Sequence, residues 1–241
     1  MEQVLSWGLD VVIAIQSIAH PALTLLMKTL TFLGSEYFYL LVLPLLVWCV
    51  DEKRGMRFGF AVILSAYTNE VLKGLFKQPR PYDMKSEVGM VHEESPGLPS
   101  GHAQNSVVFF GMLRDFISRK AGIVIAILMP LLIGFSRLYL GVHFPTDVFA
   151  GWIIGLLFLF AYRRIGPWIE QRMAKWSPVR QAAAVVLVSA VMTLTSSRSI
   201  PLAGVFFGAG IGFILALHTM ENLCEAKRRS FTRNALRYVT G

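Results

Sequence analysis

The stretch SRLYLGVHFPTD, residues 136–147, lies between two long apolar runs at 121–135 and 148–160. It places an arginine, a histidine and an aspartate where a membrane helix would end. A charged side chain at the centre of a bilayer costs about 3 kcal/mol on insertion scales. The flanking runs are therefore expected to be membrane helices. The polar stretch is either a solvated, ion-paired loop or part of a functional site.

The rest of the chain is also strongly apolar. Of its 241 residues, 54% are hydrophobic and only 16% are charged, and several windows approach the ~20 apolar residues that cross a bilayer core. Helices are expected at 36–50, 57–75, 103–118, 121–139, 147–163, 181–196 and 200–219. Polar residues interrupt the apolar segment 3–33, which holds either one spanning helix or two short interfacial helices. The sequence predicts an all-α, polytopic transmembrane helical bundle that forms a single domain over 1–241.

The net charge of +8 follows from the expected topology. Most basic residues gather in four clusters: Lys53, Arg54 and Arg57; Arg114, Arg119 and Lys120; Arg163, Arg164, Arg172, Lys175 and Arg180; and Lys227, Arg228, Arg229, Arg233 and Arg237. With the helices given above, all four fall on one side of the membrane, which the positive-inside rule makes cytoplasmic. The charge therefore gives no indication of a nucleic-acid partner, and we expect none. We expect a multi-pass protein of the inner (plasma) membrane whose loops 76–100, 140–147 and 196–200 face the outer, periplasmic or extracellular side.

Polar residues from three separate stretches converge on that outer face. One helix leaves the face after His102 and the next returns to it before His143, so the two histidines emerge together. Lys73 and Arg80 emerge there too, at the end of the preceding helix and just beyond it. The sequence therefore predicts one polar site at the outer leaflet of the membrane.

The residue types at this site are suited to binding a phosphoryl group. The three stretches supply three cations, two imidazoles, one carboxylate, a hydroxyl and a glycine amide, from Lys73, Arg80, Arg137, His102, His143, Asp147, Ser100 and Gly101. Lys and Arg neutralise phosphate oxygens, and Arg can do so bidentately. Backbone N–H groups at a Ser-Gly turn that opens a helix bind anions as well. No cluster of carboxylates stands ready for Mg²⁺ or Ca²⁺, so we expect neither a metal nor a cofactor.

The two histidines can divide the work of phosphoryl transfer. One attacks phosphorus to form a phosphohistidine, and the other protonates the departing alkoxide. The nucleophile needs a fixed tautomer, which a carboxylate provides by accepting from the far ring nitrogen. Asp147 follows His143 by four residues, the spacing that puts two side chains on one helix face. We therefore predict that His143 is the nucleophile and that His102 is the acid.

These residues form three spaced motifs, KxxxxxxRP at 73–81, PSGH at 99–102 and SRxxxxxHxxxD at 136–147. Together they resemble the signature of the type 2 phosphatidic acid phosphatase superfamily, with every specified position present in order and at the required spacing. The resemblance implies a metal-independent phosphatase with the two histidine roles given above.

The resemblance also carries expectations about architecture. It implies a membrane core of six helices, with residues 36–163 as its main part and a first spanning or re-entrant helix within 3–33. Residues 181–219 add two C-terminal helices to that core. The stretch at 33–55 is similar to the branch that contains sphingosine-phosphate phosphatases and their bacterial relatives.

Some polar residues near the motifs have more than one interpretation. Residues 92–94 (His-Glu-Glu) could ligate a metal, but an acidic, mobile outer loop explains them without one. Ser136 either braces its loop or donates to phosphate. Gln104 follows the motif histidine on its helix and is a candidate pocket residue. Asn69 lies within a predicted membrane helix, where a polar residue serves either function or packing against another polar helix.

A cation cage flanked by apolar helices suits a lipid whose phosphate stays in water while its tail stays in hydrocarbon. We predict a lipid phosphate phosphatase acting on phosphatidic acid, phosphatidylglycerol phosphate, undecaprenyl (di)phosphate or a sphingoid-base phosphate. One alternative is a phosphotransferase that passes the phosphate to a second lipid. The other is a transporter or lipid-binding protein that recognises phosphate without catalysis, which would not need two histidines. No oligomeric state follows from the sequence.

Overall fold

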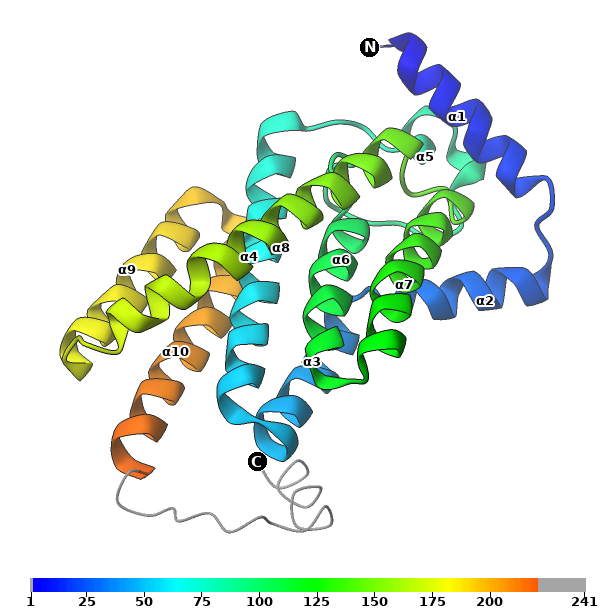
Figure 1. The fold of residues 1–241 in the computed structure, drawn as a ribbon. Coiled ribbons are helices and arrows are strands. Elements are labelled where there is room, and N and C mark those ends of the chain that lie inside the picture. Colours follow the sequence, from blue (N-terminus) through cyan, green and yellow to red (C-terminus); the bar gives the residue numbers. More distant parts are fainter. Residues whose placement is uncertain (1, 221–241) are drawn as a thin grey trace. The chain divides into compact units, whose positions relative to one another are not determined.

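A computed structural model describes residues 2–220. These residues form helices and short helical turns and contain no strand, as the predicted all-α architecture requires (Figure 1). The α-helices are α1 Glu2–Gln16, α2 Pro21–Phe32, α3 Glu36–Leu45, α4 Glu52–Phe76, α5 Pro81–Met84, α6 Gly101–Leu113, α7 Arg119–Tyr139, α8 Pro145–Met173, α9 Pro178–Thr195 and α10 Ile200–Met220. Short π or 3-10 turns lie at Leu46–Val50, Ser86–Val88, Arg114–Phe116 and Ser197–Ser199. The fourth basic cluster, 227–237, lies outside the described residues.

Four of the described helices, α7 to α10, are long and apolar enough to cross a membrane. The pair α2 and α3, bent by 51°, is a fifth candidate span. Large apolar side chains remain exposed along these helices, for example Ile127 and Leu131 on α7 and Leu157 on α8. Such side chains face lipid in a bilayer, where lipid tails are as apolar as they are. The chain is a multi-pass membrane protein.

The N-terminal segment 3–33 contains two helices and not one. α1 ends at Gln16 and α2 begins at Pro21, a residue that favours the first turn of a helix. The side-chain amide of Gln16 donates to the carbonyl oxygens of Val88 (2.8 Å) and Tyr139 (2.9 Å). α1 therefore holds together two segments that border the predicted site.

The described chain packs as two compact units. The first contains the residues up to Tyr39 and Thr68–Phe160, and so holds α1, α2, α5, α6, α7 and parts of α3, α4 and α8. The second contains Leu40–Tyr67 and the described residues from Ala161 onward, with α9 and α10 packed side by side. The single domain expected over 1–241 stays a prediction.

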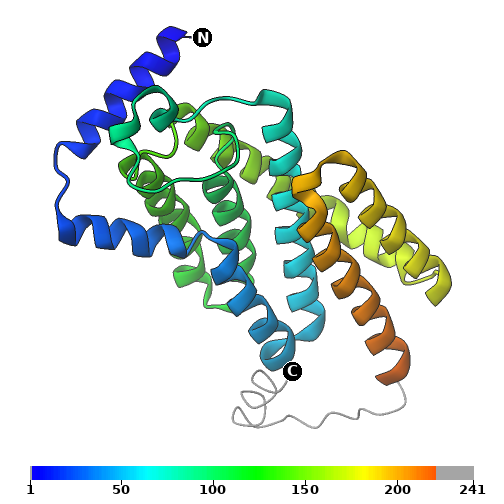
Figure 2. The ribbon, with the colours of Figure 1, turned by 180° about the vertical axis from the view of Figure 1, so that it is seen from behind.

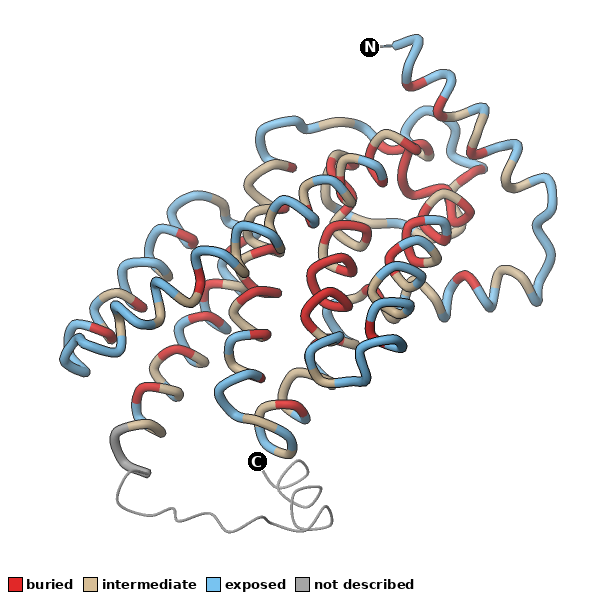
Figure 3. Tube along the Cα trace, in the orientation of Figure 1, coloured by how far each residue is buried: buried red, intermediate tan, exposed pale blue. Residues whose placement is uncertain are grey.

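Within the first unit, α6 is buried along most of its length (Figure 3) and lies beside α7 (Figure 2). It ends at Leu113, followed by a 3-10 turn, and is shorter than the predicted 103–118. Ser100 caps its N-terminus by accepting a hydrogen bond from the Ala103 amide (3.4 Å). A Cβ on Gly151 of α8 would lie 2.6 Å from the Ser100 carbonyl oxygen. Glycine at this position thus allows α8 to approach the start of α6 closely.

The loop 76–100 is more ordered than its sequence suggests, since it contains α5 and a 3-10 turn. It is fastened to the α7–α8 connection by the Met90 amide, which donates to the Leu140 carbonyl oxygen (3.0 Å). At Gly141 the chain turns with φ +70°, and a Cβ there would lie 1.8 Å from the Val88 carbonyl oxygen. The loop therefore lies tightly over the connection that carries the predicted nucleophile.

Candidate active site

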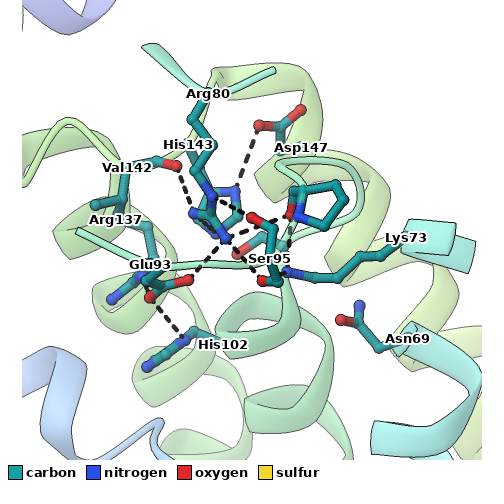
Figure 4. A network of polar contacts seen from close by, with 12 residues as sticks. Asn69, Lys73, Arg80, Glu93, Ser95, His102, Arg137, Val142, His143 and Asp147 are labelled. Carbon is teal, nitrogen blue, oxygen red and sulfur yellow. Dashed lines mark hydrogen bonds and ion pairs between the residues drawn. The ribbon is translucent and has the colours of Figure 1, made fainter. Parts of the chain in front are cut away.

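All eight predicted site residues lie in the first unit. Lys73 lies in the last turn of α4, Arg80 just before α5, Ser100, Gly101 and His102 at the start of α6, Arg137 in the last turn of α7, His143 in the α7–α8 connection and Asp147 in the first turn of α8. The polar side chains labelled in Figure 4 point toward one another from these separate elements. The three cations are almost fully buried, with exposed fractions of 1 to 3%. Buried charges are tolerated only with partners, so their contacts define the site.

Arg80 uses its whole guanidinium group. Its Nε donates to the Ser95 carbonyl oxygen (2.7 Å), Nη1 to the Val142 carbonyl oxygen (2.8 Å) and Nη2 to the Glu93 carboxylate (2.8 Å). The Lys73 ammonium donates to the Ser95 hydroxyl (2.7 Å) and to a neighbouring carbonyl oxygen (2.9 Å). The backbone carbonyl oxygens fix the Arg80 fork in place. Among these partners, only the Glu93 carboxylate carries a negative charge.

The carboxylate of Asp147 accepts from three sides. Its Oδ1 accepts from the side-chain amide of Gln78 (2.6 Å), and its Oδ2 accepts from the Phe144 amide (2.9 Å). Oδ2 also lies 3.4 Å from His143 Nδ1, a long contact of the kind that shortens when substrate binds. Because an ionised carboxylate can only accept, Nδ1 carries the proton and Nε2 keeps its lone pair.

His143 is fully buried, and its free nitrogen faces the cations. Nε2 lies 3.3 Å from Arg80 Nη1. Burial, followed by the positive charges of Arg80, Arg137 and Lys73, holds the pKa of His143 well below its ordinary value. The imidazole is therefore neutral at physiological pH, which is the form that can act as a nucleophile.

Glu93 belongs to the site, although its sequence context gave it no role there. Its carboxylate pairs with Arg80 and Arg137 and lies 3.9 Å from His102 Nδ1. Burial alone would raise the pKa of Glu93, but the surrounding cations outweigh it and bring the pKa to about 2. The interpretation of 92–94 as a mobile acidic loop is thus wrong for Glu93. The sequence held one indication that a further carboxylate belongs to the site. Three cations converge there, and Asp147 was the only carboxylate predicted beside them.

Other polar residues stabilise the site from behind. Asn69 on α4 donates to the Gln104 side-chain oxygen (2.9 Å) and to the Pro99 carbonyl oxygen (3.3 Å), so it packs against the polar start of α6. The Ser136 hydroxyl donates to the Ile133 carbonyl oxygen within α7 (2.7 Å), which agrees with a bracing role. The Ser100 hydroxyl accepts the hydrogen bond that caps α6. The predicted contacts of phosphate with this hydroxyl and with the Gly101 amide stay predictions.

Comparison with known proteins places this geometry in a family. Residues 54–171 match the model of the PAP2 superfamily. Phosphatidylglycerophosphatase B of Bacillus subtilis (strain 168) is 32% identical in an alignment of 156 positions that covers 59% of this chain and 75% of that protein. The probable sphingosine-1-phosphate phosphatase of Dictyostelium discoideum is 29% identical in an alignment of 164 positions that covers 63% of this chain and 40% of that protein. The chain thus spans about two fifths of the length of this second relative.

A solved structure agrees with these relatives. The crystal structure of a transmembrane PAP2-type phosphatidylglycerolphosphate phosphatase from Bacillus subtilis superposes with a TM-score of 0.62 and 28% sequence identity. The match covers 70% of this chain and 89% of that one. It extends the likeness from the three motifs to the helical scaffold that carries them, and the chain belongs to the PAP2 superfamily.

Proposed function

We propose that the protein is a metal-independent lipid phosphate phosphatase that works through a phosphohistidine at His143. One observation carries the proposal: the neutral His143 has its Nε2 lone pair 3.3 Å from the Arg80 guanidinium, while Asp147 lies at its other nitrogen. A phosphoryl group bound to Arg80 would therefore lie next to the nucleophile. Fixed cations stabilise the charge of the transferring group, which is the main requirement of phosphoryl transfer.

The reaction proceeds in two balanced steps. His143 Nε2 forms a bond to phosphorus, the bond between phosphorus and the oxygen on the lipid side breaks, and His102 gives its proton to the departing oxygen. Burial, followed by the positive charge of Arg137, lowers the pKa of His102 to about 3, and a bound phosphate dianion raises that pKa so that His102 carries the proton. Water then attacks the phosphohistidine while His102 takes one of its protons. The phosphorus–nitrogen bond breaks, inorganic phosphate leaves, and His143 is restored. Asp147 stabilises the imidazole while it carries the positive charge of the intermediate.

The substrate class is a membrane lipid that ends in a phosphomonoester or a diphosphate. The apolar helices of the first unit keep a lipid tail in hydrocarbon while its phosphate enters the cage. The relatives named above favour phosphatidylglycerol phosphate and sphingoid-base phosphates, and phosphatidic acid and undecaprenyl diphosphate fit the same chemistry. We further propose that the site opens to the outer face of the plasma membrane, because the basic clusters of the sequence favour a cytoplasmic location for the opposite loops.

Phosphate release from a panel of these lipids tests the proposal. Purified protein in detergent with EDTA is compared with His143→Ala and with His92→Ala, which replaces an exposed histidine in the loop 76–100. Release by the wild type and by His92→Ala, but not by His143→Ala, is expected. Release that persists in His143→Ala would refute the assigned nucleophile. If no inorganic phosphate were released but an added acceptor lipid became phosphorylated, the protein would be a phosphotransferase.

A further inference from the structure

The cation cage of this structure already holds an anion from the chain itself. The carboxylate of Glu93 pairs through one oxygen with Arg80 Nη2 (2.8 Å) and through the other with Arg137 Nη2. The second oxygen is also the one nearest His102 (3.9 Å). Figure 4 shows this carboxylate between the two guanidinium groups and the His102 ring. Two oxygens thus occupy the positions at which two oxygens of a phosphate would meet the same donors.

The Tyr82 hydroxyl holds the backbone of Glu93 in place, and with it the position of the carboxylate. The Tyr82 hydroxyl donates to the Glu93 carbonyl oxygen (2.7 Å) and accepts from the Glu93 amide (3.1 Å). The Tyr82 ring also packs edge-on against His92, at 4.8 Å between ring centroids. Tyr82 lies in α5, two residues after Arg80, so the arginine and the clamp on its carboxylate partner belong to one short segment. The carboxylate is therefore held in the cage by its backbone as well as by its charge.

We propose that Glu93 is a specificity-determining residue, an internal competitor that only a dianionic terminal phosphate displaces from the cage. The inference rests on the proposed phosphatase function, whose substrates carry such a phosphate. Because Glu93 is tethered beside the cations, its effective concentration there is in the millimolar range or above. A ligand must bind the guanidinium groups better than a carboxylate does before it can approach His143.

The competition separates two classes of membrane lipid. A terminal phosphate carries a charge of about −1.5 to −2 at neutral pH and offers three acceptor oxygens. A phosphodiester headgroup carries one negative charge and two free oxygens, no more than the carboxylate that it would have to replace. Phosphodiester lipids make up the bulk of a phospholipid bilayer and would otherwise fill an open cation cage. Glu93 thus keeps the site available for lipids that end in phosphate.

Another role for Glu93 makes a different prediction. Its contact with His102 would make it a positioning residue if it oriented the acid for proton transfer. Loss of the carboxylate would then lower kcat and leave phosphate binding unchanged. Loss of an internal competitor instead lowers KM and strengthens the binding of phosphate, and it admits phosphodiesters.

The test uses Glu93→Gln, which keeps the shape of the side chain and removes its charge. Tyr82→Phe loosens the clamp and leaves every cage charge in place. Glu94→Gln is the matched control, since Glu94 is the exposed neighbouring carboxylate. Calorimetry in detergent measures the affinity of each protein for inorganic phosphate, without turnover. Steady-state kinetics with phosphatidic acid in mixed micelles then measure KM, kcat and inhibition by phosphatidylglycerol, a phosphodiester.

We expect Glu93→Gln to bind inorganic phosphate about tenfold more tightly or better, in line with the loss of charge-assisted hydrogen bonds to the competitor. KM should fall, and phosphatidylglycerol should become an inhibitor. Tyr82→Phe should shift phosphate affinity in the same direction by about two- to threefold, equivalent to part of one neutral hydrogen bond, and it carries the test if Glu93→Gln does not fold. Unchanged or weaker phosphate binding in the folded variants, or a fall in kcat alone, would overturn the inference. A wild type that binds phosphate but releases none from any lipid would instead refute the proposed function.

Discussion

The replacement Asp147→Asn tests how the site prepares its nucleophile. The wild-type carboxylate accepts from Gln78 at Oδ1 and from Phe144 and His143 at Oδ2. Asparagine has nearly the same shape but only one oxygen, and its amide nitrogen can only donate. If the oxygen stays toward Phe144, the new amide meets the Gln78 amide, which must turn over to accept. The fold survives this change, while His143 loses the negative charge beside its Nδ1.

The size of the effect follows from that lost charge. A hydrogen bond to a charged group contributes about 1.5–3 kcal/mol. In the proposed intermediate this bond is made to a positively charged His143, so its loss raises the barrier more than it weakens binding. At about 1.4 kcal/mol for each factor of ten, kcat should fall about 10- to 150-fold, with KM changed less.

The assay is steady-state phosphate release from phosphatidic acid in mixed micelles, with thermal unfolding in the same detergent as a check on folding. Asp10→Asn, an exposed aspartate on α1, is the control and should match the wild type. A folded Asp147→Asn with kcat within about threefold of wild type, well below the expected loss, would refute the idea that Asp147 prepares His143. A large rise in KM with kcat unchanged would refute it as well, because Asp147 would then act in binding.

Three further predictions concern the loop, the cage and pH. Gly141→Ala should destabilise the fold by more than about 2 kcal/mol, because its Cβ would collide with the Val88 carbonyl oxygen at a positive φ. The control for thermal unfolding is Gly59→Ala, whose Cβ would meet nothing within 4 Å. Equal losses of stability in the two variants would contradict the prediction. Arg80→Lys should lower kcat/KM about 100-fold, since one ammonium cannot replace a fork that bonds three separate partners; kinetics within about threefold of wild type would disprove that role. The His143 ring should stay neutral from about pH 7.5 to 5.5, because burial and the positive charges of Arg80, Arg137 and Lys73 lower its pKa below the ordinary histidine value. Nitrogen NMR of the ring, assigned by comparison with His143→Ala, checks this, and the signals of an imidazolium anywhere in that range would contradict it.

The proximity of several candidate site residues could be predicted from the sequence, because the spacing of the motifs reflects simple geometry. Four residues separate His143 from Asp147, and the structure places their side chains within 3.4 Å of each other. Alternation of membrane helices predicted that His102 would emerge on the same face as His143, and both lie in the first unit. Residue type and helix count were sufficient for these inferences, because each depends only on local periodicity and on membrane crossing.

Contacts made by irregular backbone could not be predicted in the same way. Glu93 reaches the cage because the loop 76–100 folds back over it, held by Tyr82 and by the α7–α8 connection. The hydrophobic periodicity of the sequence gives no information about the path of an irregular loop. The same holds for the break between α1 and α2, where the interrupting polar residues left both one helix and two helices open. The division into two units also has no marker in composition, since it cuts through continuous helices.

In the proposed mechanism the phosphoryl group passes through a covalent bond to His143. The most direct measurement is rapid mixing of purified protein with a radiolabelled lipid phosphate, followed by an alkaline quench that preserves phosphohistidine and by peptide mapping. Transient label is expected on the peptide that contains His143 in the wild type, and no label is expected in His143→Ala. Label on the His102 peptide, or phosphate release without labelled protein at any time, would rule out His143 as the nucleophile.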